Sequence, residues 1–149
     1  MRTSAQILAE SRVIAVVGAS RDPGKVAHTV PLQILRCGWQ VIPVNPYTDE
    51  IWGQRCYPTL ADIPEPVDFV NVFRPAADTP EVARQAVAMG AKALWLQQDI
   101  VSAQARAIAE AGGLDYVEDE CIAVVRAVNA ITAVNAVTRR GTPSADPAR

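Results

Sequence analysis

Short apolar runs alternate with amphipathic segments along the chain. The first run, Arg12 to Gly18 (RVIAVVG), is rich in β-branched residues and ends in glycine, as is typical of a strand buried on both faces of a parallel sheet. At least five strands are predicted, because comparable runs follow at residues 39–45, 67–73, 91–96 and 114–117. Helical spacing and capping residues predict helices at about 26–37, 79–89 and 102–111. This alternation predicts an α/β, Rossmann-like, doubly wound fold, with a mainly parallel sheet and helices on both faces.

Two prolines and a threonine predict details of three of these elements. Pro31 is expected in the first turn of its helix, because a proline further inside would remove a helical hydrogen bond. Pro43 cannot donate a ladder hydrogen bond and therefore predicts a strand end or an edge-like stretch. Thr79 is expected to be an N-cap, with Pro80 and Glu81 in the first helical turn.

The segments outside this alternation receive separate predictions. Residues 1–11 are a polar, partly helical lead-in, and residues 46–66 are a connection with a short strand around Ile51 and a helical turn near Leu60. A single domain is expected over residues 1–138, with its core at about 12–121 and a C-terminal helix at about 121–138 that packs on the body or on another subunit. Residues 139–149 have the composition of a disordered tail.

Composition excludes several classes of protein. The chain has 149 residues, of which 50% are hydrophobic and 20% charged, as expected of a soluble domain. The net charge is −2, whereas a nucleic-acid-binding protein usually carries a basic surface, so nucleic acid is not an expected partner. No apolar run reaches the roughly 18 residues of a membrane span, and no signal peptide is visible, so a cytoplasmic location is expected. The three cysteines are widely spaced, which predicts reduced thiols and no metal site.

The turn after the first strand carries the strongest functional signal. Ligands bind such sheets at the carboxyl ends of the strands. Here the chain leaves the strand as GASRDPGK, residues 18–25, and then enters a helix whose free N–H groups attract anions. Gly18 allows close approach of the backbone, and Ser20 offers a hydroxyl, while Arg21 and Lys25 add positive charge. A pyrophosphate matches this set of groups.

Two common nucleotide motifs fit this turn poorly. The dinucleotide fingerprint requires glycine where Ser20 and Pro23 stand, and a P-loop requires Ser or Thr where Val26 follows the lysine. The second strand ends at Asn45 and Pro46, without the acidic residue that binds the ribose of NAD. A neutral amide there tolerates a nearby phosphate. This favours a phosphorylated adenosine of the NADP or coenzyme A type.

Several segments also occur in the order found in a known family. They are VVGASRD at residues 16–22, VIPVNP at 41–46, VFR at 72–74 and ALWLQ at 93–97, with the linking stretch GQRCYPTLADIP at 53–64. With these segments the chain resembles the small bacterial CoA-binding domain proteins. That family is similar to the CoA-binding domain of succinyl-CoA synthetase but stands alone.

The resemblance implies coenzyme A as the ligand and assigns roles to ten residues. The pyrophosphate would be held by Gly18, Ala19, Ser20, Arg21 and Lys25. The adenosine part would be flanked by Asn45 and Pro46, the next binding loop would begin at Phe73 and Arg74, and the site would be closed by Gln97.

No catalytic constellation accompanies these residues. The only histidine, His28, has no identifiable partner, and the acidic residues 118–120 disfavour thiolate chemistry at Cys121. Non-catalytic binding of coenzyme A or an acyl-CoA is therefore the leading hypothesis. The alternatives are an NAD(P)-dependent oxidoreductase, and a nucleotide-regulated protein that forms a homodimer or binds a protein partner through its C-terminal helix.

Overall fold

Five short strands form a parallel sheet at the centre of the computed structural model, which describes residues 1–133. The strands are β1 (Val13–Val17), β2 (Gln40–Val44), β5 (Phe69–Val72), β6 (Ala93–Leu96) and β7 (Asp115–Val117). Their order across the sheet is β2-β1-β5-β6-β7. The chain adds β2 on one side of β1 and then crosses to add β5 on the other, which creates a topological switch point at β1 and β5.

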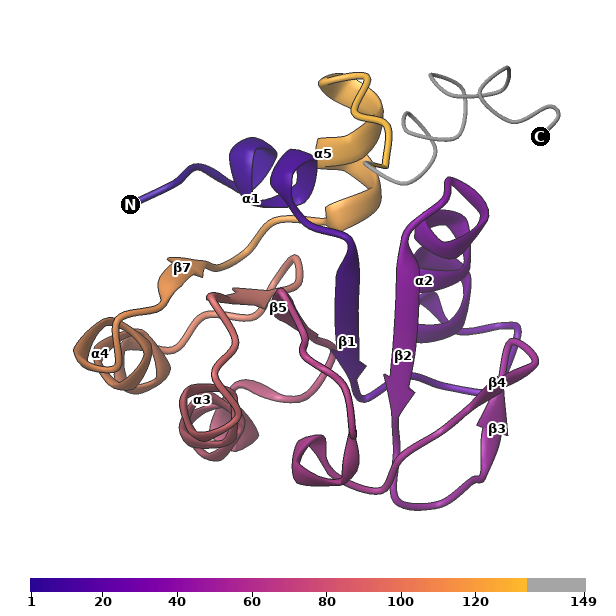
Figure 1. The fold of residues 1–149 in the computed structure, drawn as a ribbon, viewed down its shortest axis with the longest axis horizontal. Helices are drawn as coiled ribbons and strands as arrows, with labels where there is room; N and C mark the ends of the chain where they lie inside the picture. Colours follow the sequence, from indigo (N-terminus) through magenta and orange to yellow (C-terminus); the bar gives the residue numbers. More distant parts are fainter. Residues whose placement is uncertain (134–149) are drawn as a thin grey trace, which may run out of the picture.

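Helices cover both faces of this sheet (Figure 1). One face packs against α1 (Ser4–Glu10), α2 (Val26–Arg36) and α5 (Ile122–Val128), and the other against α3 (Thr79–Ala88) and α4 (Ala103–Ala111). The β2–β5 connection contains an antiparallel hairpin, β3 (Glu50–Ile51) and β4 (Gln54–Arg55), and the 3₁₀ helix η1 (Leu60–Asp62). The predicted α/β fold, the short strand at Ile51 and the helical turn at Leu60 are confirmed.

The two faces of the sheet bury different kinds of side chain. On the α1, α2 and α5 face, Trp95 stacks on Phe69 with ring centroids 5.6 Å apart, and the indole of Trp39 donates to the Ser11 carbonyl at 3.1 Å. On the other face, alanines such as Ala86 and Ala105 are fully buried between α3 and α4. Both faces of the sheet are therefore buried, which is why the strands consist almost entirely of apolar residues.

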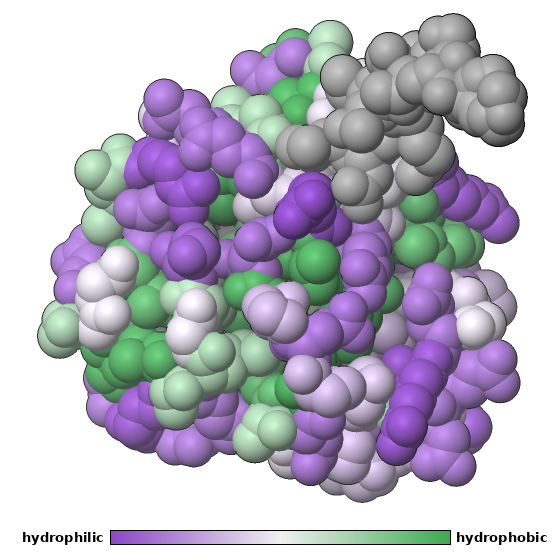
Figure 2. Space-filling view, viewed as in Figure 1, coloured by the Kyte–Doolittle hydropathy of each residue, from purple (hydrophilic) through white to green (hydrophobic). Residues whose placement is uncertain are grey.

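The surface of the protein is mixed in character. Figure 2 shows apolar side chains interspersed with polar ones over the visible face. The exposed large apolar residues within the described chain include Val26, Tyr47, Val101, Val124 and Val128. Within residues 1–133, no helix has the length and apolar character needed to cross a membrane.

Two of the three details predicted from the sequence differ from the structure. Pro31 lies in the interior of α2, because the loop before the helix supplies the partner that the proline takes away: Ser20 N–H donates to the Ala27 carbonyl at 3.1 Å. The N-cap of α3 is Asp78 rather than Thr79, because the 3₁₀ helix η2 (Ala76–Asp78) runs directly into α3. The edge position predicted from Pro43 is confirmed, since β2 is an outer strand of the sheet.

The C-terminal helix is shorter than its sequence predicts. Helix α5 ends at Val128, and Ala130 has a positive φ of 51°, so the predicted helix is wrong for residues 129–133. The reason is burial of the chain after the turn: Ile131 and Ala133 fold back into the core. Helix α5 packs on α1 and α2, which makes it part of the body. The remainder of the predicted helix and the predicted disordered tail lie outside the described residues.

Candidate ligand site at the carboxyl end of the sheet

Two adjoining cavities lie at the carboxyl end of β1, beside the topological switch point. The first, which we call the loop cavity, has a volume of about 260 Å³ and lies against the turn that follows β1. The second, the apolar cavity, has a volume of about 330 Å³ and lies between the end of β2 and α3. Gly18, Pro46 and Arg74 line both cavities and therefore form their common boundary.

Gly18 lets the chain turn sharply between two strand ends. Its φ is +87°, and a Cβ atom at this position would stand 2.6 Å from the backbone oxygen of Phe73. Its N–H donates to the Val44 carbonyl at 3.1 Å. Any side chain at residue 18 would push the exit of β1 away from β5, so glycine is required for a tertiary reason as well as a local one.

Asn45 connects the end of β2 to the turn. Its side-chain Nδ2 donates to the Ala19 carbonyl at 2.8 Å, and its Oδ1 accepts from the Tyr47 N–H at 2.7 Å. The second contact is an Asx turn, which stops the strand. Asn45 thus holds the loop against the sheet while remaining on the wall of the loop cavity.

The start of α2 has uncompensated N–H groups beside the loop cavity. No side chain caps this helix, and within the described residues neither the Val26 nor the Ala27 amide has a hydrogen-bond acceptor. Ala27 and the exposed Lys25 both line the cavity. Ser20 Oγ accepts from the Asp22 N–H at 3.0 Å, which leaves the hydroxyl hydrogen free to donate. These donors and the lysine charge favour an anion.

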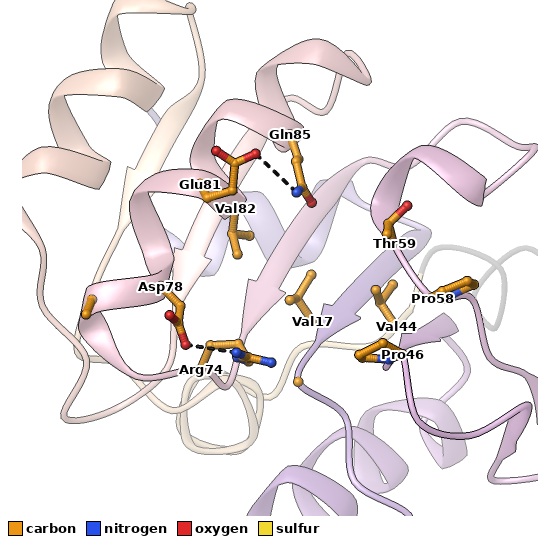
Figure 3. Close-up of a pocket in the computed structure, with 12 residues that line it drawn as sticks. Val17, Val44, Pro46, Pro58, Thr59, Arg74, Asp78, Glu81, Val82 and Gln85 are labelled. Atoms are coloured by element: carbon orange, nitrogen blue, oxygen red, sulfur yellow. Dashed lines mark hydrogen bonds and ion pairs between the residues drawn. The ribbon is translucent and has the colours of Figure 1, made fainter.

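The apolar cavity has a different character. Figure 3 shows Val17, Val44 and Val82 around one opening, with Thr59 and Gln85 on one side and Arg74 on the other. The Arg74 guanidinium forms an ion pair with Asp78 at 2.9 Å. The full lining consists of Val17, Gly18, Val44, Pro46, Pro58, Thr59, Arg74, Ala77, Asp78, Glu81, Val82 and Gln85. Apolar walls with a polar rim are typical of small-molecule sites in general.

The structure brings together eight of the ten residues that the family resemblance assigns to the site. The loop cavity is lined by Gly18, Ala19, Ser20, Lys25, Asn45, Pro46, Phe73 and Arg74, together with Ala27 and Tyr47. Arg21 is exposed and lines neither cavity. Gln97 is 6% exposed, and its Oε1 accepts from Asn71 Nδ2 at 3.4 Å and from the Ile122 N–H at 3.3 Å. Gln97 therefore connects β6 to α5.

Sequence reasoning missed the walls of the apolar cavity. Pro58 and Thr59 come from the long β2–β5 connection, and Val82 comes from α3. The available signal was topological: the segments after β2 and β5 both leave the carboxyl edge of the sheet, next to the turn after β1.

Two potentially reactive side chains near the site, His28 and Cys56, are engaged in structural contacts. His28 Nδ1 lies 2.7 Å from the Ser20 carbonyl oxygen, and its ring faces Trp52. Burial raises the pKa of the Cys56 thiol, whose Sγ donates to the Asn45 carbonyl at 3.6 Å, and this favours the neutral thiol. Within residues 1–133, no cluster of three or more histidine, cysteine or acidic side chains could hold a metal ion.

Comparison with known proteins identifies the family. Residues 12–127 match the family described as CoA binding domain. The chain belongs to this CoA-binding domain family. The matched segment runs from β1 almost to the end of α5, so it contains both cavities and the helices that support them.

Relatives of this CoA-binding domain occur alone and within larger enzymes. Uncharacterized protein YneT of Bacillus subtilis is 37% identical over 123 residues, which is 83% of this chain and 91% of YneT. Acetate–CoA ligase [ADP-forming] II of Archaeoglobus fulgidus is 37% identical over 81 residues, covering 53% of this chain but only 12% of the ligase. A hypothetical protein from Pyrococcus horikoshii has a solved structure that superimposes with a TM-score of 0.81 at 34% identity, covering 85% of this chain and 92% of that chain. The resemblance noted in the sequence is confirmed, and the chain is related to the CoA-binding part of the ligase.

Proposed function

We propose that the protein binds coenzyme A or an acyl-CoA without acting on it chemically. The observation that carries this proposal is the pairing of two unlike cavities across Gly18: one offers hydrogen-bond donors and a positive charge, and the other offers apolar walls. Coenzyme A has the same order of groups, because its adenosine is joined directly to a pyrophosphate. Membership of the CoA-binding domain family supports the assignment.

The pyrophosphate is assigned to the loop cavity. Ala27, whose amide is free within the described residues, lines this cavity on the side of α2, together with Ser20 and Lys25. Charge-assisted hydrogen bonds of this kind are the strong ones, and the partial positive charge of a helix N-terminus adds to them. The Ala27 amide is a backbone group and is therefore already oriented before a ligand arrives.

The adenine is assigned to the apolar cavity. Val17, Val44 and Val82 would contact the faces of the ring, while Thr59 and Gln85 offer polar atoms to its edge. The neutral Asn45 at the end of β2, where NAD-binding proteins carry an acid, leaves room for a phosphate on the ribose.

The non-catalytic assignment rests on how the reactive side chains are used. His28 and Asn45 hold the loop, and the Cys56 thiol is kept neutral by burial and donates to a carbonyl. The neutral Cys56 thiol and the Asn45 amide are poor nucleophiles and bases, and His28 does not line the loop cavity.

Calorimetric titration with CoA, NAD and NADP in parallel tests the proposal. The protein is first unfolded and refolded to remove any bound ligand. Lys25→Ala is expected to weaken CoA binding by about tenfold or more, since a charge-assisted hydrogen bond contributes roughly 1.5–3 kcal/mol. Arg21→Ala is the matched control, because it removes the same charge from the same loop at a residue outside the cavity.

Each outcome has a definite meaning. The assignment is supported if the wild-type protein prefers CoA, and if the affinity for CoA falls in Lys25→Ala but changes little in Arg21→Ala. Equal affinity of the wild-type protein and Lys25→Ala contradicts the phosphate site, and a preference for NAD or NADP contradicts coenzyme A as the ligand.

A further inference from the structure

Helix α2 contains a proline where a helix normally forms a hydrogen bond. In an α-helix the carbonyl of residue 27 accepts from the N–H of residue 31. Residue 31 is Pro31, which has no N–H and whose ring crowds that carbonyl. The Ala27 carbonyl is therefore left without its helical donor.

The loop before the helix uses this carbonyl. Ser20 N–H donates to the Ala27 oxygen at 3.1 Å, although the two residues are joined by an irregular loop. The bond fixes the peptide between Ala19 and Ser20, and both of these residues line the loop cavity. A residue that never touches the cavity thus determines how its wall is held.

A second contact holds the following peptide. His28 Nδ1 lies 2.7 Å from the Ser20 carbonyl oxygen. A carbonyl oxygen only accepts, so Nδ1 carries the hydrogen, which is true of both the Nδ1–H neutral ring and the protonated ring. The first turn that carries His28 is itself fixed from outside, because the Trp52 indole donates to the His28 carbonyl at 3.1 Å.

We propose that Pro31 and His28 are positioning residues for the anion site: Pro31 reserves the Ala27 carbonyl for the Ser20 amide, and His28 holds the Ser20 carbonyl. This rests on the proposed function. Together the two contacts hold Ser20 in the wall of the loop cavity, beside Ala27, before the ligand binds. The ligand then does not have to order the loop, which improves affinity without adding a contact.

Pro31→Ala distinguishes two roles for the proline. A structural role predicts a lower melting temperature, whereas a positioning role predicts weaker CoA binding without loss of stability. An alanine restores the helical donor, so the melting temperature is expected to stay the same or rise. The new N–H competes with Ser20 for the Ala27 carbonyl, and affinity for CoA and for ADP is expected to fall about three- to tenfold. Affinity for adenosine is expected to stay the same, because adenosine lacks the phosphate.

His28 is tested by removal and by rescue. His28→Ala is expected to weaken CoA and ADP binding to a similar extent, and His28→Asn is expected to restore it, since the asparagine amide places an N–H near the Nδ1 position. Thr29→Ala is the control, as an exposed residue in the same turn. Exchange of the Ser20 amide hydrogen, measured by NMR without ligand, is expected to be faster in Pro31→Ala than in the wild-type protein.

The results separate this inference from the proposed function. If the wild-type protein does not bind CoA, the proposed function fails, and Ser20 amide exchange still reports whether Pro31 reserves the Ala27 carbonyl for the Ser20 amide. If the wild-type protein binds and Pro31→Ala binds equally well, with unchanged Ser20 exchange, the positioning role is overturned. Equal losses for adenosine and ADP also overturn it, because they indicate general damage to the fold.

Discussion

Replacing Gly18 by alanine tests the close approach on which the ligand site depends. The residue lies at the point where β1, β2 and β5 end and where the two cavities meet. Its φ of +87° is strained for any L-residue, and an added Cβ would lie 2.6 Å from the Phe73 oxygen and 3.0 Å from the Arg74 Cδ. The arginine side chain can move aside, but the backbone oxygen can move only if β5 shifts.

The expected cost has two parts. The left-handed conformation costs an alanine about 1–2 kcal/mol. Forcing a methyl group against packed backbone costs about 1–3 kcal/mol more. Gly18→Ala is therefore expected to lower the free energy of unfolding by roughly 2–5 kcal/mol and to weaken CoA binding, because any relief of the contact moves a shared wall of both cavities.

Urea unfolding of Gly18→Ala beside Gly53→Ala separates the two parts. Gly53 has a similar φ of +70°, but nothing lies within 4 Å of an added Cβ. Gly53→Ala should lose only the conformational part, about 1–2 kcal/mol, and should bind CoA like the wild-type protein. If Gly18→Ala loses no more stability than Gly53→Ala and binds CoA normally, the close approach to Phe73 does not matter and the reasoning is refuted.

Two further predictions concern the C-terminal part of the fold. Ile122 is fully buried, so Ile122→Ala is expected to lower the free energy of unfolding by about 2–5 kcal/mol in urea titrations, whereas Val124→Ala, exposed on the same helix, should change it by less than about 0.5 kcal/mol. Burial, and then the hydrogen bond to Glu118, raise the pKa of the Tyr116 phenol, so the folded state keeps a proton that the unfolded state releases near pH 10. Stability is therefore expected to fall as the pH rises above about 10, by up to about 1.4 kcal/mol per pH unit, and this part of the fall should be missing in Tyr116→Phe.

The strands and their order of appearance could be predicted because their cause is local. A strand covered on both faces must be apolar at nearly every position, so runs such as residues 12–18 and 91–96 are visible without knowing their neighbours. Pro43 predicted an outer strand for the same kind of reason, since a missing N–H has the same effect in any fold. The helix predicted at about 102–111 begins as expected from its sequence, because Ser102 caps α4 and its Oγ accepts from the Ala105 N–H at 3.0 Å.

Local rules failed where a distant segment supplied the missing partner. Pro31 is tolerated inside α2 because the loop at Ser20 uses the freed carbonyl, and no property of the helix alone reveals this. The predicted helix after Cys121 has suitable apolar spacing to about residue 137, but the core draws Ile131 inward after a turn. Burial outweighs helix propensity here, because propensity differences are small per residue.

The sequence by itself predicted where the candidate site lies, since a glycine turn between a buried strand and a helix is typical of anion-binding turns in doubly wound sheets. Only the tertiary structure decided which side chains face it. Lys25 lines the loop cavity and Arg21 does not, although both are cations in the same turn. Gln97 connects β6 to α5 inside the core. The direction of a side chain depends on the elements packed around it, and the apolar cavity exists only because segments far apart in the sequence meet at one edge of the sheet.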